Sequence, residues 1–293
     1  MNTPALMLAA LVIVSGCVSF GGALSAFSLT PTKKVSLVEE LRITGSAAPN
    51  ELLEHKKTTL SFELTNAGNT TLQNAALNLT DTCVLDPLNA EDVYTELGSI
   101  RQGEIKGLDI DLQAQGTNLT QDCTVRYAAS YESAATLISD VVVVSEDELT
   151  RLNKQGASPD LRIFETATAG PVEISFRVSK PQPIPVDTTF LVYIQLADKG
   201  AGNAEPIEVG ALTMSYPSTV ELDAAGCDDL SATPDGLLAN GRDVKFFNHE
   251  SKTITCKFRT VSGGVVNEVG QFRADVAYKY ILRNSIAVKV KPA

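Results

Sequence analysis

The sequence predicts an all-β protein built from two sandwich domains in tandem, and three observations support this fold class. Apolar and polar residues alternate with a period of two along most of the chain, which places one strand face on a core and the other in water. Turn signals rich in Gly, Asn and Pro interrupt these runs at short intervals. The two halves of the chain also repeat one order of features. A chain of 293 residues is long enough for two packed cores.

The first 32 residues are predicted to form an N-terminal hydrophobic helix that serves as a signal or membrane anchor. Residues 5–29 carry no charge, and about 20 apolar residues suffice for a helix to cross the hydrocarbon core. Within them, Val14-Ser15-Gly16-Cys17 resembles a lipobox, so Cys17 is a candidate lipidation site. The uncleaved helix is the favoured alternative, because acylation at Cys17 would leave the apolar residues 18–29 without a place in the fold.

Four further cysteines predict two disulfides and therefore an oxidising compartment. They fall as one pair in each half, Cys83 with Cys123 and Cys227 with Cys256, and they lack the clustered spacing of zinc ligands. Four buried free thiols remain the alternative. Two lysines at positions 33 and 34 would place the chain after the anchor in the cytoplasm by the positive-inside tendency, whereas the cysteines favour the cell exterior.

The first domain is predicted over residues 33–146. Thr59–Thr65 and Leu108–Leu112 alternate cleanly, and Val141–Val144, which is apolar on both faces, is expected to be a covered strand. Residues 147–158 are predicted to be a polar linker with a short helix that begins after a Ser145 cap.

The second domain is predicted over residues 159–293. Val172–Val178 and Ile254–Arg259 alternate, and Thr189–Ile194 is apolar on both faces. Lys180–Pro185 is either a polyproline II ligand or an extended lead-in to the next strand, in which proline blocks edge pairing. We favour the lead-in, because the segment lies inside the strand pattern.

The two halves look like diverged copies of one unit. The first half contains Thr58-Thr59, then a strand, then Ala67-Gly68-Asn69. The second half has the same order, with Thr188-Thr189, a strand and Ala201-Gly202-Asn203. In each half, two cysteines and strands that carry Tyr and Val follow. The segment 58–69, which ends in Asn66-Ala67-Gly68-Asn69, resembles the strand and turn of CARDB and related immunoglobulin-like or fibronectin-type modules of archaeal and bacterial surface proteins. The whole plan is similar to membrane-anchored archaeal surface proteins. The resemblance implies two tandem immunoglobulin-like β-sandwiches without shared catalytic residues.

Few residues are candidates for chemistry, so the sequence predicts no enzymatic activity, no catalytic residue and no cofactor. His55 and His249 lie far apart, and no Gly-x-Ser-x-Gly motif is present. An acidic group could line a calcium site, but a solvated loop is the favoured interpretation and no metal site is predicted. Its members are Asp223, Asp228, Asp229 and Asp235. Three sequons make Asn69, Asn78 and Asn118 candidates for glycosylation.

These features together predict a non-enzymatic, membrane-anchored surface protein that faces the cell exterior. Its β-sandwiches are expected to have a structural, adhesive or protein-binding role, with the membrane, other surface proteins or a second copy as partners. A formal net charge of −11 disfavours nucleic acid as a partner. The alternatives are an accessory subunit of a membrane-bound assembly and a carbohydrate-binding module, which the absence of tryptophan disfavours.

Overall fold

The computed structural model describes residues 39–155, 164–246, 251–261 and 267–293, all of which belong to one compact unit. The predicted N-terminal helix over residues 1–32, Cys17 and His249 lie outside these ranges. The described residues form an all-β structure with one α-helix and one short 3-10 helix. Neither of these two helices is long and apolar enough to cross a membrane.

The strands form two four-stranded sheets and one eleven-stranded sheet. The first small sheet has the order β1 (Leu41–Ala48), β3 (Lys57–Asn66), β7 (Ile105–Ala114), β5 (Leu85–Pro87). The second has the order β10 (Val172–Val178), β12 (Thr189–Asp198), β18 (Lys252–Thr260), β15 (Val220–Cys227). The large sheet has the order β16 (Leu230–Ala232), β17 (Leu238–Asn240), β14 (Leu212–Ser215), β19 (Asn267–Lys291), β8 (Gln121–Val144), β4 (Leu72–Asp81), β6 (Tyr94–Ile100). Its short flanking strands are β2 (Glu51–Leu53), β9 (Glu165–Ala167), β11 (Ile184–Pro185) and β13 (Asn203–Ala204), and the helices are η1 (Ala90–Val93) and α1 (Glu146–Gln155).

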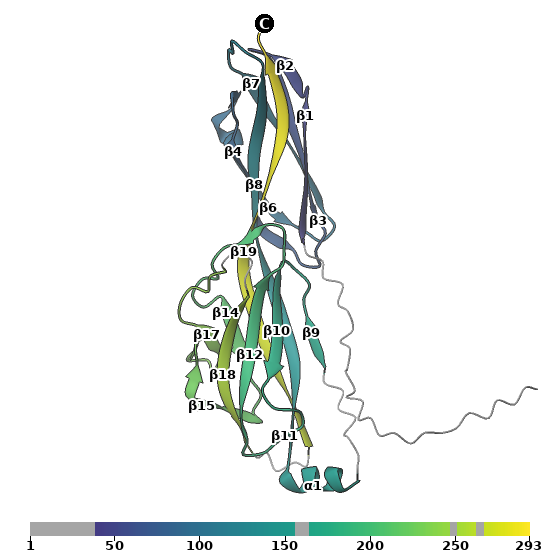
Figure 1. The fold of residues 1–293 in the computed structure, drawn as a ribbon, viewed down its shortest axis with the longest axis vertical. Helices are drawn as coiled ribbons and strands as arrows, with labels where there is room; N and C mark the ends of the chain where they lie inside the picture. The colour runs from purple at the N-terminus through teal and green to yellow at the C-terminus, as the bar shows by residue number, and fades with distance from the viewer. Residues whose placement is uncertain (1–38, 156–163, 247–250, 262–266) are drawn as a thin grey trace, which may run out of the picture. The chain divides into compact units, whose positions relative to one another are not determined.

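Strands β8 and β19 form one continuous antiparallel ribbon. Val144 lies opposite Asn267 at one end and Gln121 lies opposite Val290 at the other, and the register does not shift between them. At about 3.4 Å per residue, 24 consecutive residue pairs make a ribbon roughly 80 Å long. Figure 1 shows the two strands side by side as they pass from the strands of one small sheet to those of the other.

The ribbon faces a different small sheet on each side of its middle, so it belongs to two sandwich-like halves. Val125 pairs with Ile286, and the C-terminal end of the chain therefore completes the half that contains β1, β3, β7 and β5. Val141 pairs with Gly270 in the other half, which contains β10, β12, β18 and β15. The predicted ranges 33–146 and 159–293 each contain one small sheet, and each sends the end of its last strand into the half of the other.

The strand order repeats between the halves. The order β1-β3-β7-β5 corresponds to β10-β12-β18-β15, and β8-β4-β6 on one side of the large sheet corresponds to β19-β14-β17 on the other. This agreement supports duplication of one unit. The expected correspondence of the cysteines is wrong, because Cys123 lies on β8 whereas Cys256 lies on β18, which corresponds to β7.

The alternating residues meet in one continuous hydrophobic core. In the first half, the ring of Phe62 on β3 packs edge-on against Tyr127 on β8, with ring centroids 4.9 Å apart. In the second half, Phe258 on β18 packs edge-on against Phe272 on β19 at 5.3 Å. Aromatic pairs in this geometry stabilise the fold by about 0.5–1.5 kcal/mol beyond the stabilisation that comes from the area they bury.

Two connecting segments follow local signals in the sequence. Helix α1 begins after Ser145, whose Oγ accepts a hydrogen bond from the Glu148 amide at 3.3 Å, as the predicted cap requires. Ile184 in the proline-rich segment is buried and pairs in parallel with Val143, so this segment has a structural role. The expectation that proline blocks pairing there is wrong, because the following Val186 amide donates to the Val144 carbonyl at 3.0 Å.

Candidate functional site

Glu40 is a buried carboxylate at the middle of the ribbon, where the two halves meet. Tyr278 and Ser133 lie beside Glu40. They are opposite each other on β19 and β8 and form one of the two central residue pairs of the ribbon. The Tyr278 hydroxyl donates to Glu40 Oε2 at 3.2 Å, and Thr70 Oγ1 donates to Oε1 at 3.4 Å. The Glu40 carbonyl accepts from the amides of the turn after β3. One residue therefore ties the start of β1, this turn and the ribbon together.

A second buried acid, Asp198, lies at the end of β12 in the other half, at the place that corresponds to Asn66 at the end of β3. Its carboxylate accepts hydrogen bonds from the Gly200 amide at 3.3 Å, the Ala204 amide at 3.0 Å and the Tyr280 hydroxyl at 3.1 Å. In the first half, Asn66 at the end of β3 accepts from the Gly68 amide at 2.9 Å in the same way. Each half thus ends a central strand with a side chain that organises the next turn.

The turn over residues 199–203 also requires glycine at the ribbon. A Cβ atom added to Gly202 would lie 2.3 Å from the Ile281 carbonyl oxygen, which is a backbone atom of β19. Gly202, which the sequence comparison of the two halves singled out, therefore allows close approach of two backbones.

Burial governs the electrostatics of this cluster. It raises the pKa of the Glu40 carboxyl above its ordinary value, against the opposing effect of the hydrogen bonds from Ser133, Tyr278 and Thr70. Burial likewise raises the pKa of Tyr131, whose hydroxyl has no hydrogen-bond partner among the residues that the structure describes. Among the ion pairs of the described residues, none neutralises Glu40. The cluster thus ties the first half to the middle of the ribbon through a carboxylate that burial disfavours in its charged form.

We predict that Glu40→Gln removes a pH dependence from the stability of the protein. Because burial raises the folded-state pKa, the contribution of Glu40 is fully present below its unfolded pKa and is lost as pH rises through the folded pKa. The free energy of unfolding of Glu40→Gln should therefore rise relative to that of the parent as the pH increases above 4.5, the ordinary pKa of a glutamate carboxyl. Urea unfolding at several pH values measures this difference, with the exposed Glu63→Gln as the control. Parallel pH curves for Glu40→Gln and the parent would contradict the assignment.

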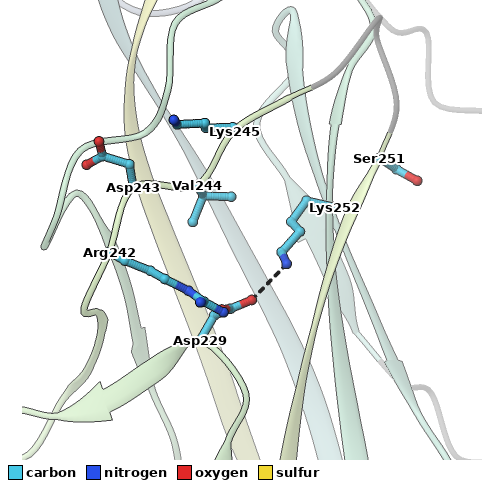
Figure 2. Close-up of a pocket in the computed structure, with 7 residues that line it drawn as sticks. All are labelled: Asp229, Arg242, Asp243, Val244, Lys245, Ser251 and Lys252. Atoms are coloured by element: carbon cyan, nitrogen blue, oxygen red, sulfur yellow. Dashed lines mark hydrogen bonds and ion pairs between the residues drawn. The ribbon is translucent and has the colours of Figure 1, made fainter.

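A second charged cluster lines a pocket of about 460 Å³ in the other half (Figure 2). Lys252 Nζ lies 2.9 Å from Asp229 Oδ2, and Arg242 Nε donates to Asp229 Oδ1 at 2.8 Å. The hydrogen bond from Lys252, followed by that from Arg242, lowers the pKa of the Asp229 carboxyl. Two cations therefore hold this buried carboxylate in its charged form, and the cluster links β16, β18 and the loop after β17.

The four aspartates at positions 223, 228, 229 and 235 are predicted from the sequence to lie in a solvated loop, and the structure agrees with this only in part. Asp229 is buried and paired with cations, so the prediction is wrong for this residue. Asp223 lies 3.3 Å from Lys257 Nζ, and Asp235 accepts a hydrogen bond from Thr233. Throughout the described ranges, no group of three or more His, Cys, Asp or Glu side chains could hold a metal ion.

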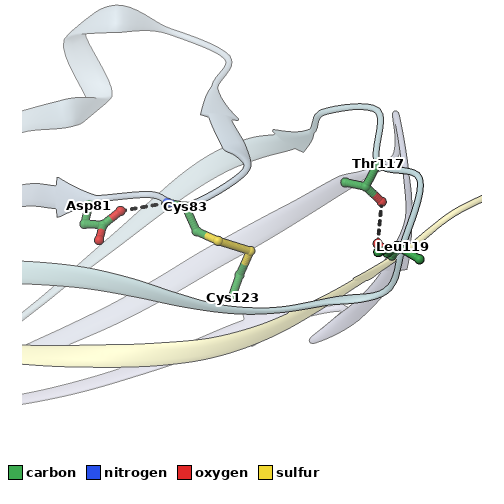
Figure 3. Close-up of a disulfide and its surroundings, with 5 residues drawn as sticks. All are labelled: Asp81, Cys83, Thr117, Leu119 and Cys123. Atoms are coloured by element: carbon green, nitrogen blue, oxygen red, sulfur yellow. Dashed lines mark hydrogen bonds between the residues drawn. A yellow bond between two sulfur atoms is a disulfide. The ribbon is translucent and has the colours of Figure 1, made fainter.

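The predicted cysteine pairs are joined in the structure. Figure 3 shows the bridge from Cys83, in the turn after β4, to Cys123 near the start of β8, with Cα atoms 5.7 Å apart. Cys227 and Cys256 lie opposite each other on β15 and β18, with Cα atoms 4.0 Å apart. The second bridge lies within one sheet, whereas the characteristic disulfide of antibody domains joins two facing sheets.

The sequons differ in accessibility. Asn69, in the turn after β3, and Asn118, in the loop before β8, are exposed. Figure 3 shows Thr117 and Leu119, the sequence neighbours of Asn118, and the Thr117 Oγ1 donates to the Leu119 carbonyl at 3.0 Å. Asn78 is half-buried on β4 and lines a surface pocket with Tyr94 of β6. His55, the histidine within the described ranges, lies in the loop before β3 with a positive φ of 60°.

Comparison with known proteins gives no family. No family model and no curated protein matches the chain. Among the solved structures that match, three examples cover 80–87% of this chain. They are a red sea bream transglutaminase at 10% identity and TM-score 0.22, an Escherichia coli alpha-2-macroglobulin at 11% and 0.25, and the secreted serine protease VesC of Vibrio cholerae at 8% and 0.20. The matches take up 32%, 22% and 48% of those chains. Such low TM-scores carry no conclusion about fold or function.

Sequence reasoning missed the two buried acids at the middle of the ribbon. Glu40 follows Glu39 in a run that reads as solvated, and no local pattern marks its burial. For Asp198 a signal existed, since Asp198 precedes Gly200 by two residues as Asn66 precedes Gly68, but the comparison of the halves aligned Gly68 with Gly202 instead.

Proposed function

We propose that the protein is a non-enzymatic, membrane-anchored surface protein that faces the cell exterior and has a structural or protein-binding role. The observation that carries this proposal is the ribbon of β8 and β19, which runs without a break through both sandwich-like halves. A shared ribbon resists bending between the halves better than a flexible linker, and such stiffness suits a module that presents surfaces to a partner.

The compartment and the fold family belong to the same proposal. Two disulfides support an oxidising environment. Repeated sandwich-like halves support the likeness to tandem immunoglobulin-like modules such as CARDB, within an archaeal membrane-anchored surface protein.

The predicted membrane attachment is tested by fractionation. The full chain should sediment with membranes, resist extraction by high salt and dissolve in detergent, because residues 5–29 supply an uncharged apolar segment. A chain that begins at Lys33 should remain in the soluble fraction, fold and lack hydrolytic activity. The intact mass of the mature protein distinguishes the two anchors. A protein with an uncleaved helix keeps residues 1–16, whereas a protein lipidated at Cys17 would lack them. A truncated chain that still sediments with membranes, or that aggregates under oxidising conditions, would overturn the proposal.

A further inference from the structure

Strand β10 is an edge of the second small sheet and pairs only with β12 among the described residues. The pairing runs from Val172 opposite Asp198 to Val178 opposite Val192 with no shift of register. Edge strands carry a row of unpaired amide and carbonyl groups that can accept another strand. Natural sheets commonly protect such edges with proline, charged side chains or a bulge. Strand β10 contains no proline, lysine or bulge, and its charged residues are one acid and one base, Glu173 and Arg177.

The turn and loop hydrogen bonds that flank β10 show which of its backbone groups face outward. The Ser179 amide donates to the Leu191 carbonyl at 2.9 Å, and the Lys199 amide donates to the Pro171 carbonyl at 2.7 Å. Because hydrogen-bonded pairs alternate along an antiparallel ladder, the odd-numbered residues of β10 bond to β12. The amide and carbonyl groups at four even-numbered positions therefore point to the free edge. These positions are Val172, Ile174, Phe176 and Val178.

The sequence of β10 is complementary to itself when two copies run antiparallel about Ser175. The order is Val-Glu-Ile-Ser-Phe-Arg-Val. With Ser175 opposite Ser175 of a second copy, Glu173 lies opposite Arg177 and Arg177 lies opposite Glu173. The four outward-facing backbone positions fall opposite one another in the same register, so every free amide meets a free carbonyl.

We propose that the protein forms a two-fold symmetric dimer in which β10 pairs with β10 of a second copy. The two small sheets would then join into one sheet of eight strands across the interface. This inference deepens the proposed protein-binding role by naming the partner, and it rests on that role. It does not depend on the membrane anchor.

The charges favour this register. Glu173 and Arg177 are exposed, and Glu173 forms no ion pair with any described residue. The Arg177 guanidinium lies over the ring of Tyr193, 4.7 Å from its centroid, on the outer face of the sheet. Opposite charges at non-hydrogen-bonded positions are the closer type of cross-strand pair. Because two chains of net charge −11 repel each other, these two local pairs are needed for association.

Other long edges fit a second copy less well. The pairing of β15 with β18 shifts in register between Leu222 and Cys227, and that of β6 with β4 also shifts. Strand β1 pairs regularly with β3, but Arg42 is its sole charged residue and would find no carboxylate in a second β1. Charge complementarity therefore selects β10.

Cysteine cross-linking of the full chain in detergent tests the register, in a Cys17→Ser background. Non-hydrogen-bonded residues lie about 4.5 Å apart between Cα atoms, which is within the range of a disulfide. Ser175→Cys should therefore give a disulfide-linked dimer under mild oxidation. Ser46→Cys on the exposed edge of β1 is the matched control and should cross-link much more slowly. Glu173→Cys mixed with Arg177→Cys should cross-link, whereas neither alone should, because each faces the other position.

Charge reversal separates this dimer from accidental contact. Glu173→Arg or Arg177→Glu places like charges opposite each other twice per dimer, so the dissociation constant should rise about tenfold or more. The double variant restores both pairs and should return to within about threefold of the parent. Analytical ultracentrifugation in low salt measures all four proteins.

Two results would overturn the proposal. One is a Ser175→Cys chain that cross-links no faster than Ser46→Cys. The other is association that is unchanged by single reversal or not restored by the double variant. Because membrane fractionation is a separate measurement, failure of the dimer leaves the proposed membrane attachment standing, and failure of the attachment leaves the dimer standing.

Discussion

Removing the Cys83–Cys123 disulfide by Cys83→Ala with Cys123→Ala is expected to lower the free energy of unfolding by about 4 kcal/mol. The bridge spans 40 residues, and in the chain-entropy model closing a loop of this length restricts the unfolded state by about that amount. Since single domains are stable by only about 5–15 kcal/mol, the loss should be visible as a large fall in the denaturant midpoint. Urea unfolding of the parent and the double variant measures it.

The second bridge supplies a matched comparison. Cys227→Ala with Cys256→Ala opens a loop of 29 residues, for which the same model gives a slightly smaller loss, about 3.6 kcal/mol. Cys17→Ala should leave the unfolding free energy unchanged, because the four other cysteines form the two bridges. If either double variant unfolds at the parent's midpoint, the corresponding bridge does not stabilise the fold.

Phe258→Ala is expected to cost about 3–5 kcal/mol, the usual range for a buried aromatic side chain. The ring is fully buried on β18 and touches three other aromatic rings, at centroid distances of 5.2, 5.3 and 6.2 Å. Its partners are Tyr216, Phe272 and Phe190. Because β8 and β19 belong to both halves, the loss should shift one common unfolding transition and not only that of the second half.

Phe164→Ala is the control for this substitution. Phe164 is 55% exposed, so truncating it should change the free energy of unfolding by no more than about 0.5 kcal/mol. Near-ultraviolet circular dichroism follows the aromatic core, and far-ultraviolet circular dichroism follows the strands of both halves. If Phe258→Ala and Phe164→Ala lowered the free energy of unfolding by equal amounts, this result would contradict the packing described for the second half.

The sequence contained the fold class and the disulfide partners because both follow from local patterns. Period-two alternation in Thr59–Thr65 and Val172–Val178 reflects which side of a strand is buried, whatever its neighbours are. The cysteine pairs could be assigned since each half holds one pair and no metal-ligand spacing competes with it. The Ser145 cap likewise needs only residues within one turn.

Only the tertiary structure decided how the halves are joined. Val125 and Ile286 are direct partners although most of the chain separates them, and alternation is the same for every register that keeps one face buried. The sequence therefore could not show that the C-terminal strand completes the first half. Nor could it show that Glu40 and Asp229 are buried, because carboxylates in acidic runs usually face water.

Strand β10 combines both sources of information. The order Val-Glu-Ile-Ser-Phe-Arg-Val can be read directly from the sequence, and its symmetry of charge is a local property. Whether that symmetry can act depends on which backbone groups are left unpaired, and this is set by the position of β10 at the end of its sheet. Sheet order arises from packing between segments distant in the chain, so it cannot be read from the strand itself.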